Sequence, residues 1–300
     1  MFSFTKKQQV WDIFNIKIGG QPGCYPTVLF GGLFFKNGLD FQSAEKHLYN
    51  MFQLSKKTGN PAVPDFFIKE ENYVEKIVGF IDRCLPEDQA FAVDMTDPEV
   101  KVKVLEELDK RDLLPRTIYN SIHIGVTDEE VDALKEFTPE AAIVVAFNPK
   151  DKSPDGKIEI LENSAHLKEK GLLDIASDVG IDKIILDAAA LAPGDYSGAA
   201  VSAIPVLKEE YGLPVGCAIH NVVEKSGWLR KNFESSFSCV DAASNINISL
   251  FGGDYAIFGS IENSERVFSV VSWEDILVSE YTENYFGVEP AGFHPRRKLL

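Results

Sequence analysis

The sequence predicts a (β/α)₈ barrel, an α/β fold in which eight parallel strands alternate with helices. Residues 90–122 show the repeating unit: one apolar run ends at Asp94, a helical pattern opens after Asp97-Pro98, and a second run ends at Asn120. Asp97 can cap the helix and Pro98 suits its first turn, which makes this a strand–helix–strand crossover. The continuous apolar runs are typical of buried parallel strands. The alternative, a doubly wound open sheet, is disfavoured because no GxGxxG follows the first strand.

The same pattern predicts the other elements in chain order. Apolar and polar residues alternate loosely over 2–18, which predicts a short hairpin at the bottom of the barrel. The segment SPDG at 153–156 predicts a polar loop. The strands are predicted at 27–35, 62–68, the runs ending at 94 and 120, 141–147, 183–190, 213–219 and 255–259. The helices are predicted at 41–58, 70–83, from 98, at 127–137, 164–179, up to 211, at 236–250 and 263–286. No linker composition divides the chain, so we expect one domain over 1–300, with 1–23 as hairpin and turn and 24–300 as the barrel.

The composition excludes several classes of function. The 300 residues carry 46 acidic and 30 basic side chains, a net charge of −16, which disfavours nucleic acids and anionic membranes as partners. There is no signal peptide and no apolar run of about 18 residues, so we expect a cytoplasmic protein without membrane insertion. The four cysteines lack CxxC spacing, which fits reduced thiols and argues against a zinc or other metal site.

Short polar residues follow five of the predicted strands. They are Asp94, Asn120, Asn148, Asp187 and Asn221. Any one of them has an ordinary explanation, because Asp and Asn often end strands by capping the next turn. Five at the same end of parallel strands, where such barrels bind ligands, predict a binding site.

The residue types indicate the class of ligand. A carboxylate can accept two parallel N–H bonds from an amidine-like edge of a heterocycle, and Asn both donates and accepts. Phosphate is less favoured, because the Gly-rich cradle with Lys is missing. A glycosidase needs a paired acid and base, often Glu; Asp94 and Asp187 could serve as the pair, but nothing in the sequence marks either as having a raised pKa.

Several segments, in this order, resemble the family of the H subunit of tetrahydromethanopterin S-methyltransferase. They are GGQPGCYPTVLFGGLFF, the turn at 56–60, IYNSI, FNP, DAAALAPG and LPVGCAIHN. Bacterial relatives of that family include methylcobalamin:tetrahydrofolate methyltransferases. The chain is also distantly similar to methyltetrahydrofolate:corrinoid methyltransferases and dihydropteroate synthases. The resemblance implies a barrel that binds a pterin at the carboxyl ends of its strands.

The resemblance also implies a role for each strand-end residue. Asp94, Asn120 and Asp187 would bind the pterin ring, and Asn221 would lie near its N5 atom. We add Asn148 to the pterin-binding set because it lies between these residues in the sequence. Asn221 would orient or stabilise protonated N5, and the proton would arrive through water or an Asp. Asp94 and Asp187 would serve binding first and proton transfer second. The expected reaction moves a methyl group between a corrinoid and N5 of tetrahydrofolate. The alternatives are the same reaction on tetrahydromethanopterin within the coenzyme M methyltransferase complex, and a non-catalytic pterin-binding subunit.

The corrinoid is expected on a partner protein, as methylcobalamin or cob(I)alamin, because the DxHxxG signature is absent. A homodimer is implied by the resemblance alone. His220 is expected to face away from the pocket, because neighbours on a strand alternate and Asn221 faces it. A condensation like that of dihydropteroate synthase is disfavoured, because the strand ends lack the cationic groups that pyrophosphate requires.

Overall fold

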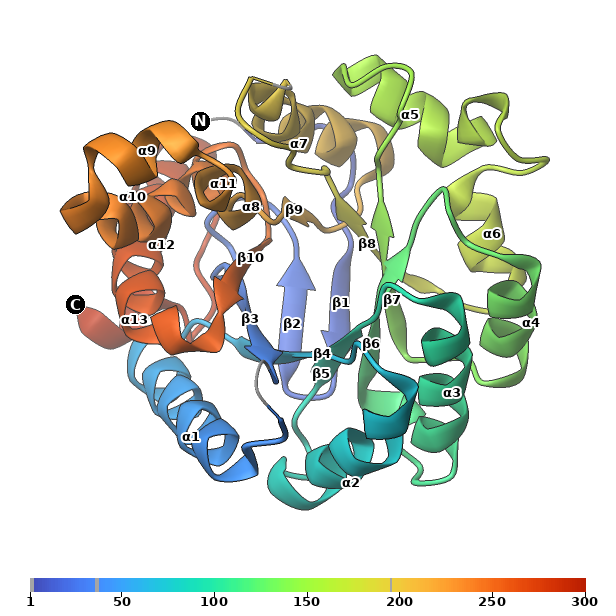
Figure 1. The fold of residues 1–300 in the computed structure, drawn as a ribbon. Helices are drawn as coiled ribbons and strands as arrows, with labels where there is room; N and C mark the ends of the chain where they lie inside the picture. The colour runs from blue at the N-terminus through green and yellow to red at the C-terminus, as the bar shows by residue number, and fades with distance from the viewer. Residues whose placement is uncertain (1–2, 36–37, 195) are drawn as a thin grey trace.

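The computed structural model describes residues 3–35, 38–194 and 196–300 and has eight parallel strands closed into a barrel inside a ring of helices (Figure 1). The predicted (β/α)₈ fold is therefore confirmed. The order around the barrel is β10-β3-β4-β5-β6-β7-β8-β9. The strands are β3 (Val28–Phe34), β4 (Ala62–Phe67), β5 (Phe91–Asp94), β6 (Thr117–Ile122), β7 (Ala141–Val145), β8 (Lys183–Asp187), β9 (Val215–Cys217) and β10 (Tyr255–Ser260).

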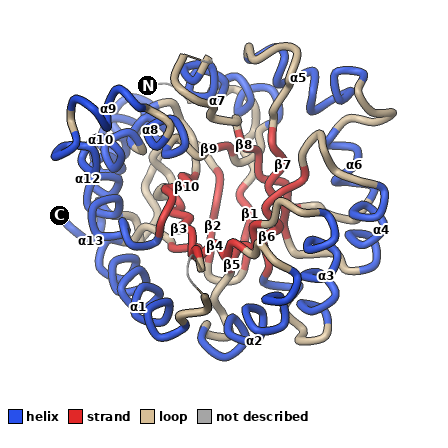
Figure 2. Tube along the Cα trace, in the orientation of Figure 1, coloured by secondary structure: helices blue, strands red, loops and turns tan. Residues whose placement is uncertain are grey.

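Helices cover the outside of the barrel on all sides, as Figure 2 shows in blue around the red strands. The α-helices are α1 (Phe41–Thr58), α2 (Val74–Cys84), α3 (Pro98–Asp109), α4 (Asp128–Glu136), α5 (Pro154–Asn163), α6 (Leu172–Asp178), α7 (Ser197–Tyr211), α8 (His220–Glu224), α9 (Gly227–Asn232), α10 (Phe237–Ser244), α11 (Ile246–Leu250), α12 (Ser264–Phe286) and α13 (Pro295–Leu299). Short 3₁₀ turns lie at Glu71–Tyr73, Leu114–Arg116, Ser164–His166, Glu234–Ser236 and Ile261–Asn263. Along the described parts of the chain, no helix combines the length and apolar character needed to cross a bilayer.

The N-terminal hairpin closes the amino end of the barrel. Strands β1 (Val10–Ile13) and β2 (Ile16–Gly19) pair antiparallel, and Ile13, Ile16 and Ile18 are buried in the same cluster as the interior of the barrel. The hairpin predicted within residues 2–18 lies at residues 10–19, and Phe2, at the start of the predicted segment, is outside the described residues. Burying these isoleucines seals one end and leaves the other end available for a ligand.

The prediction for residues 153–179 is wrong in two places. The expected loop is the start of α5, with Pro154 in the first turn and the Ser153 hydroxyl accepting the Gly156 N–H. The expected helix from residue 164 begins only at Leu172 (α6), because the chain turns through left-handed conformations at Ser164 and Ala165. A Ser-Pro pair is a strong start signal for a helix, and here it outweighs the turn character of Asp155-Gly156.

Alternation along the strands determines which residues reach the mouth of the barrel. Ala92, Ile118 and Ile185 lie in the interior cluster, and the next inward positions, two residues later, are polar in each strand. These positions are Asp94 on β5, Asn120 on β6 and Asp187 on β8. The polar groups therefore form the layer directly above the apolar core.

Candidate functional site

A cavity of about 460 Å³ occupies the carboxyl end of the barrel. This volume is within the range of small-molecule sites. Its lining comes from the ends of the strands and the loops after them: Gly32, Phe34, Asp65, Asp94, Asn120, His123, Val145, Phe147, Asp187, Ala189, Ala190, Leu191, Ala218, His220, Asn221, Ile257 and Gly259. Phe34, Phe147, Leu191 and Ile257 contribute apolar surface, so a flat ring has both apolar and polar surfaces to contact.

Four of the five predicted site residues come together here, and one does not. Asp94, Asn120, Asp187 and Asn221 line the cavity, although they are spread over more than a hundred residues of sequence. Asn148 is not among the lining residues and is almost completely buried. Its amide nitrogen donates to the Gly156 carbonyl at 2.9 Å, and its oxygen accepts the Lys150 N–H at 2.9 Å. Asn148 thus stabilises the loop between β7 and α5.

Asp65 is a lining residue that the sequence prediction did not include. It lies inside β4, two positions after Val63, which faces the barrel interior. The amide of Asn120 donates to Asp65 Oδ2 at 3.0 Å, while Oδ1 is buried and has no partner among the described residues. The sequence did contain a signal for Asp65, namely a carboxylate within the apolar strand AVPDFF. This signal was missed because Asp65 does not end the strand and because it follows a proline. A buried oxygen without a partner indicates a group that a ligand satisfies.

The carboxylates of the cavity have unusual protonation properties. Burial, reinforced by the negative charge of Asp94, raises the pKa of Asp65 well above its ordinary value, against the hydrogen bond from Asn120. Burial raises the pKa of Asp94 to about 6, opposed by the positive charge of Lys101. The raised pKa of Asp65 favours its protonated form, which can donate a hydrogen bond, whereas the ionised form of Asp94 accepts one.

Asp187 forms the opposite wall of the cavity. Burial raises its pKa to about 6, opposed by the hydrogen bond from the Ala189 N–H (2.6 Å) and by the charge of Lys157. Lys157 is itself buried behind this wall. No lysine or arginine is among the residues described as lining the cavity, so its inner surface carries carboxylates without a direct cationic partner.

A buried network supports the cavity from behind β6. Lys101 donates to Glu130 at 2.9 Å and to the Ser121 carbonyl at 3.2 Å, and the Tyr119 hydroxyl donates to the same Glu130 oxygen at 2.7 Å. Both side chains of the ion pair are almost fully buried. Because Lys101 holds the backbone next to Asn120, the network fixes this strand end and keeps a positive charge close to Asp94.

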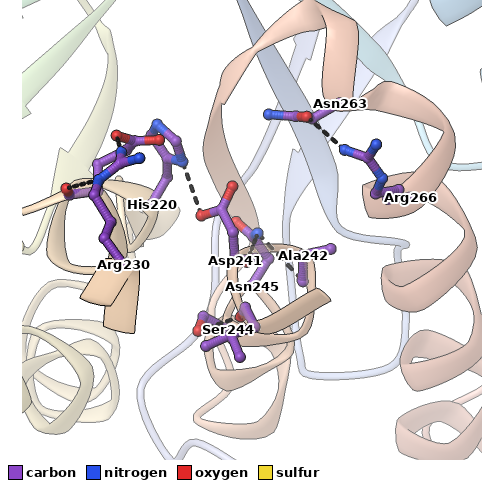
Figure 3. Close-up of polar contacts among 10 residues, drawn as sticks. His220, Arg230, Asp241, Ala242, Ser244, Asn245, Asn263 and Arg266 are labelled. Carbon is purple, nitrogen blue, oxygen red and sulfur yellow. Dashed lines mark hydrogen bonds and ion pairs between the residues drawn. The ribbon is translucent and has the colours of Figure 1, made fainter. Parts of the chain in front are cut away.

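The expectation that His220 faces away from the pocket is wrong. The strand ends at Cys217, so the alternation rule does not apply; His220 and Asn221 begin helix α8, and both line the cavity. His220 Nδ1 lies 2.8 Å from the Asp241 carboxylate on α10, as Figure 3 shows. The histidine is therefore part of the cavity wall and is oriented by a buried acid.

Comparison with known proteins identifies the family. Residues 6–291 match the sequence profile of the tetrahydromethanopterin S-methyltransferase MtrH subunit family. The chain belongs to this family. The corresponding methyltransferase component of Methanothermobacter thermautotrophicus is 37% identical to this MtrH-family chain, with 100% of both chains covered. That of Methanopyrus kandleri is 36% identical over 95% of each chain. The resemblance inferred from the short motifs is confirmed, and the family consists of methyltransferase subunits.

Solved structures show the same fold at low sequence identity. Dihydropteroate synthase from Xanthomonas albilineans with 4-aminobenzoic acid superimposes with a TM-score of 0.60 at 15% identity, covering 91% of this chain and 99% of that one. The enzyme from Thermus thermophilus gives a TM-score of 0.55 at 15% identity over 83% of this chain and 94% of that one. These similarities confirm the barrel of the MtrH-family chain and carry no argument about its reaction.

Proposed function

We propose that this protein transfers a methyl group between N5 of tetrahydromethanopterin and a corrinoid carried by a partner protein. The observation that carries the proposal is the set of carboxylates around one cavity at the barrel mouth, with Asp65 Oδ1 buried and lacking a hydrogen-bond partner among the described residues. Membership of the MtrH family supports the choice of reaction.

The cavity matches the hydrogen-bonding edge of a pterin. Ionised Asp94 or Asp187 can accept the two parallel N–H groups of the amino-pyrimidine edge. Protonated Asp65 can donate to a ring nitrogen or carbonyl oxygen, and Asn120 is held next to it by their hydrogen bond. The absence of cations from the described lining favours a ring with N–H donors over an anionic pyrophosphate ester.

The chemistry at N5 needs a proton and a fixed position. An N5 amine is a poor leaving group as an anion, so protonation of N5 must accompany loss of its methyl group. Asn221 cannot supply this proton, but its amide oxygen can accept a hydrogen bond from protonated N5. Proton transfer by positioned groups contributes typically about 10²–10⁴-fold to such a step. The corrinoid is the second substrate and accepts the methyl group.

The proposal also specifies which pterin is the substrate. The preference for tetrahydrofolate, inferred from the sequence, receives no support from the relatives, whose names specify tetrahydromethanopterin. We therefore place tetrahydromethanopterin first and make tetrahydrofolate the comparison substrate. The contacts proposed above involve the ring that both pterins share, so the ring-binding residues are expected to serve either one.

A partner protein and a second copy of the chain are also part of the proposal. The relatives are named as subunits, which supports an assembly with the protein that carries the corrinoid.

The homodimer is supported by an exposed apolar stripe on α12, where Trp273, Leu277 and Tyr285 recur at multiples of four residues. Light scattering of Leu277→Lys and the unchanged chain tests the dimer: the substitution should yield a monomer.

The decisive experiment follows methyl transfer from methylcobalamin by its visible spectrum, with tetrahydromethanopterin or tetrahydrofolate as acceptor. We expect turnover with tetrahydromethanopterin, and Asn221→Ala should lower the rate more than it lowers pterin affinity measured by calorimetry. Tight pterin binding without turnover, when the partner corrinoid protein is also supplied, would instead indicate a non-catalytic pterin-binding subunit. Faster turnover with tetrahydrofolate would reverse the order of the two pterins.

A further inference from the structure

His220 and Asp241 form a pair at the edge of the cavity. The imidazole Nδ1 and a carboxylate oxygen of Asp241 are 2.8 Å apart, and the Asp241 side chain is 5% exposed while that of His220 is 14% exposed. Figure 3 shows the ring directed toward the carboxylate of Asp241 on the neighbouring helix. An ionised carboxylate accepts from Nδ1–H, so Nε2 is left as the nitrogen that exchanges a proton with a ligand.

The backbone of β10 makes room for this ring. Gly259 lines the same cavity at a φ of +77°, and a Cβ atom at this position would lie 2.3 Å from His220 Nε2 and 2.6 Å from Cε1. Cδ2 would lie 2.4 Å away, so the three ring atoms are at nearly equal distances and it is the face of the imidazole that packs over Gly259, where only glycine fits. The ring is held from one side by Asp241 and from the other by β10, which restricts its orientation.

Other charged groups near the pair have their own partners or lie across the cavity. Glu224, one turn further along α8, pairs with Arg230 of α9. The amide of Asn245 donates to the backbone carbonyl of Asp241 at 3.0 Å, which anchors α10 at this residue. Across the cavity lie the titratable groups Asp65, Asp94, His123 and Asp187. Asp241 is thus the acid that contacts the ring of His220 directly.

We propose that His220, oriented by Asp241, is the residue that exchanges the proton with N5 of the bound pterin. This inference rests on the proposed function and assigns the proton, which Asn221 cannot supply. In methyl transfer away from the pterin, the proton moves from Nε2–H to N5 and leaves a neutral imidazole. The bond from N5 to the methyl group then breaks with its electron pair on N5, while the corrinoid supplies the pair for its new bond to carbon. In the reverse direction, Nε2 takes the proton from N5.

Asp241 has a defined part in this step. Its negative charge stabilises the imidazolium and fixes Nδ1 as the nitrogen that keeps its hydrogen. In Asp241→Asn, the shape of the contact remains but the charge is lost. The contact then no longer fixes Nδ1 as the nitrogen that keeps its hydrogen, and the neutral ring can take the other tautomer.

The test compares His220→Gln, Asp241→Asn and a matched control, His47→Gln, which changes a histidine on α1 outside the cavity lining. The assay is methyl transfer from N5-methyl-tetrahydromethanopterin to cob(I)alamin, with pterin affinity measured by calorimetry. We expect His220→Gln to lower the maximal rate by about 10²-fold or more while affinity changes less than about threefold. His47→Gln should behave as the unchanged chain.

Asp241→Asn provides a readout that a purely structural role would not move. The maximal rate should fall by about tenfold or more while pterin affinity changes less than about threefold, and Asp241→Glu, which keeps the carboxylate, should recover part of the lost rate. A His220→Gln rate within about threefold of the unchanged chain would overturn the inference, as would equal losses of rate and affinity. If the unchanged chain itself transfers no methyl group, the proposed function fails first. If it does and His220→Gln matches it, only the role of His220 fails.

Discussion

At the amino end of the barrel, the side chains of Asp254 and Asp275 are almost fully buried, like those of Asp65 and Asp187 at the carboxyl end, but their oxygen atoms all accept hydrogen bonds from the protein. Asp254 accepts from Lys208 at 2.8 Å on both oxygens and from the Val215 N–H. Asp275 accepts from the N–H and hydroxyl of Thr27 and from the amide of Asn60. The same residue type therefore serves to hold the fold at one end and is left available to a ligand at the other.

This difference shows how to separate a binding site from a structural polar cluster. Burial raises the pKa of Asp275 to about 7 and that of Asp187 to about 6, so a raised pKa alone does not distinguish the two ends. The two ends differ in their hydrogen-bond partners. At the amino end, protein groups donate hydrogen bonds to the carboxylate oxygens, whereas at the mouth Asp65 Oδ1 has no hydrogen-bond partner among the described residues.

The largest effect is expected at the amino end. Lys208→Met removes the cation that pairs with Asp254 and leaves a buried carboxylate unpaired, which should cost about 3–5 kcal/mol in the free energy of unfolding. Urea unfolding measures this, with Lys46→Met on the exposed side of α1 as a control that stays within about 0.5 kcal/mol. A loss at Lys208 no larger than at Lys46 would contradict the structural assignment of this end.

A pair of substitutions tests the comparison directly. Asp187→Asn should weaken tetrahydromethanopterin binding by about 10–100-fold, as expected for losing a hydrogen bond to a charged group, without lowering stability. Asp275→Asn should do the reverse, costing about 1–3 kcal/mol in stability with unchanged affinity, because it disrupts contacts within the protein. Calorimetry and urea unfolding of both variants supply the measurements. Equal destabilisation by the two substitutions would remove the distinction between the ends.

The pH dependence of stability sharpens the account of the mouth. The folded-state pKa of Asp94, about 6, is above the ordinary aspartate value of about 4. Protonation of Asp94 therefore favours the folded state: its contribution is complete below pH of about 4 and is lost as the pH rises through about 6. Asp94→Asn should be more stable than the unchanged chain at pH 8 and nearly equal to it at pH 4. Urea unfolding at the two pH values checks this; a constant difference would show that Asp94 titrates normally.

The smallest effect is expected at Asn148, which lies outside the cavity lining. Asn148→Ala should lower the free energy of unfolding by about 1 kcal/mol, because the hydrogen bonds that hold the loop after β7 are lost. Pterin affinity, measured by calorimetry, should stay within about twofold. A large loss of affinity at unchanged stability would return Asn148 to the binding site.

Much of the barrel follows from sequence because its signals are local. The cap of α1 at Gly59, the Asp97-Pro98 start of α3 and the apolar runs of the strands each depend on a few neighbouring residues. The prediction for segment 153–179 is wrong because two local signals conflict there. A Ser-Pro helix start overlaps an Asp-Gly turn signal, and the backbone geometry at Ser164 decides where the next helix begins.

The site is predictable only as far as strand ends define it. Asp94, Asn120 and Asp187 follow from alternation, which puts the last inward residues of neighbouring strands in one layer. Asp65 does not follow from it, because its position depends on how β4 is staggered against β5, where Asp65 pairs with Ala92. His220 and Asp241 are 21 residues apart and lie on different helices, α8 and α10. No local sequence pattern therefore predicts their contact.

A crystal structure with N5-methyl-tetrahydromethanopterin bound would test the central claim most directly. The account predicts the pterin ring in the barrel mouth, with its N–H groups within hydrogen-bond distance of Asp94 or Asp187 and a ring atom paired with Asp65 Oδ1. The carboxylates at the amino end should keep their protein partners. A ring bound elsewhere, with Asp65 Oδ1 still lacking a hydrogen-bond partner, would contradict it.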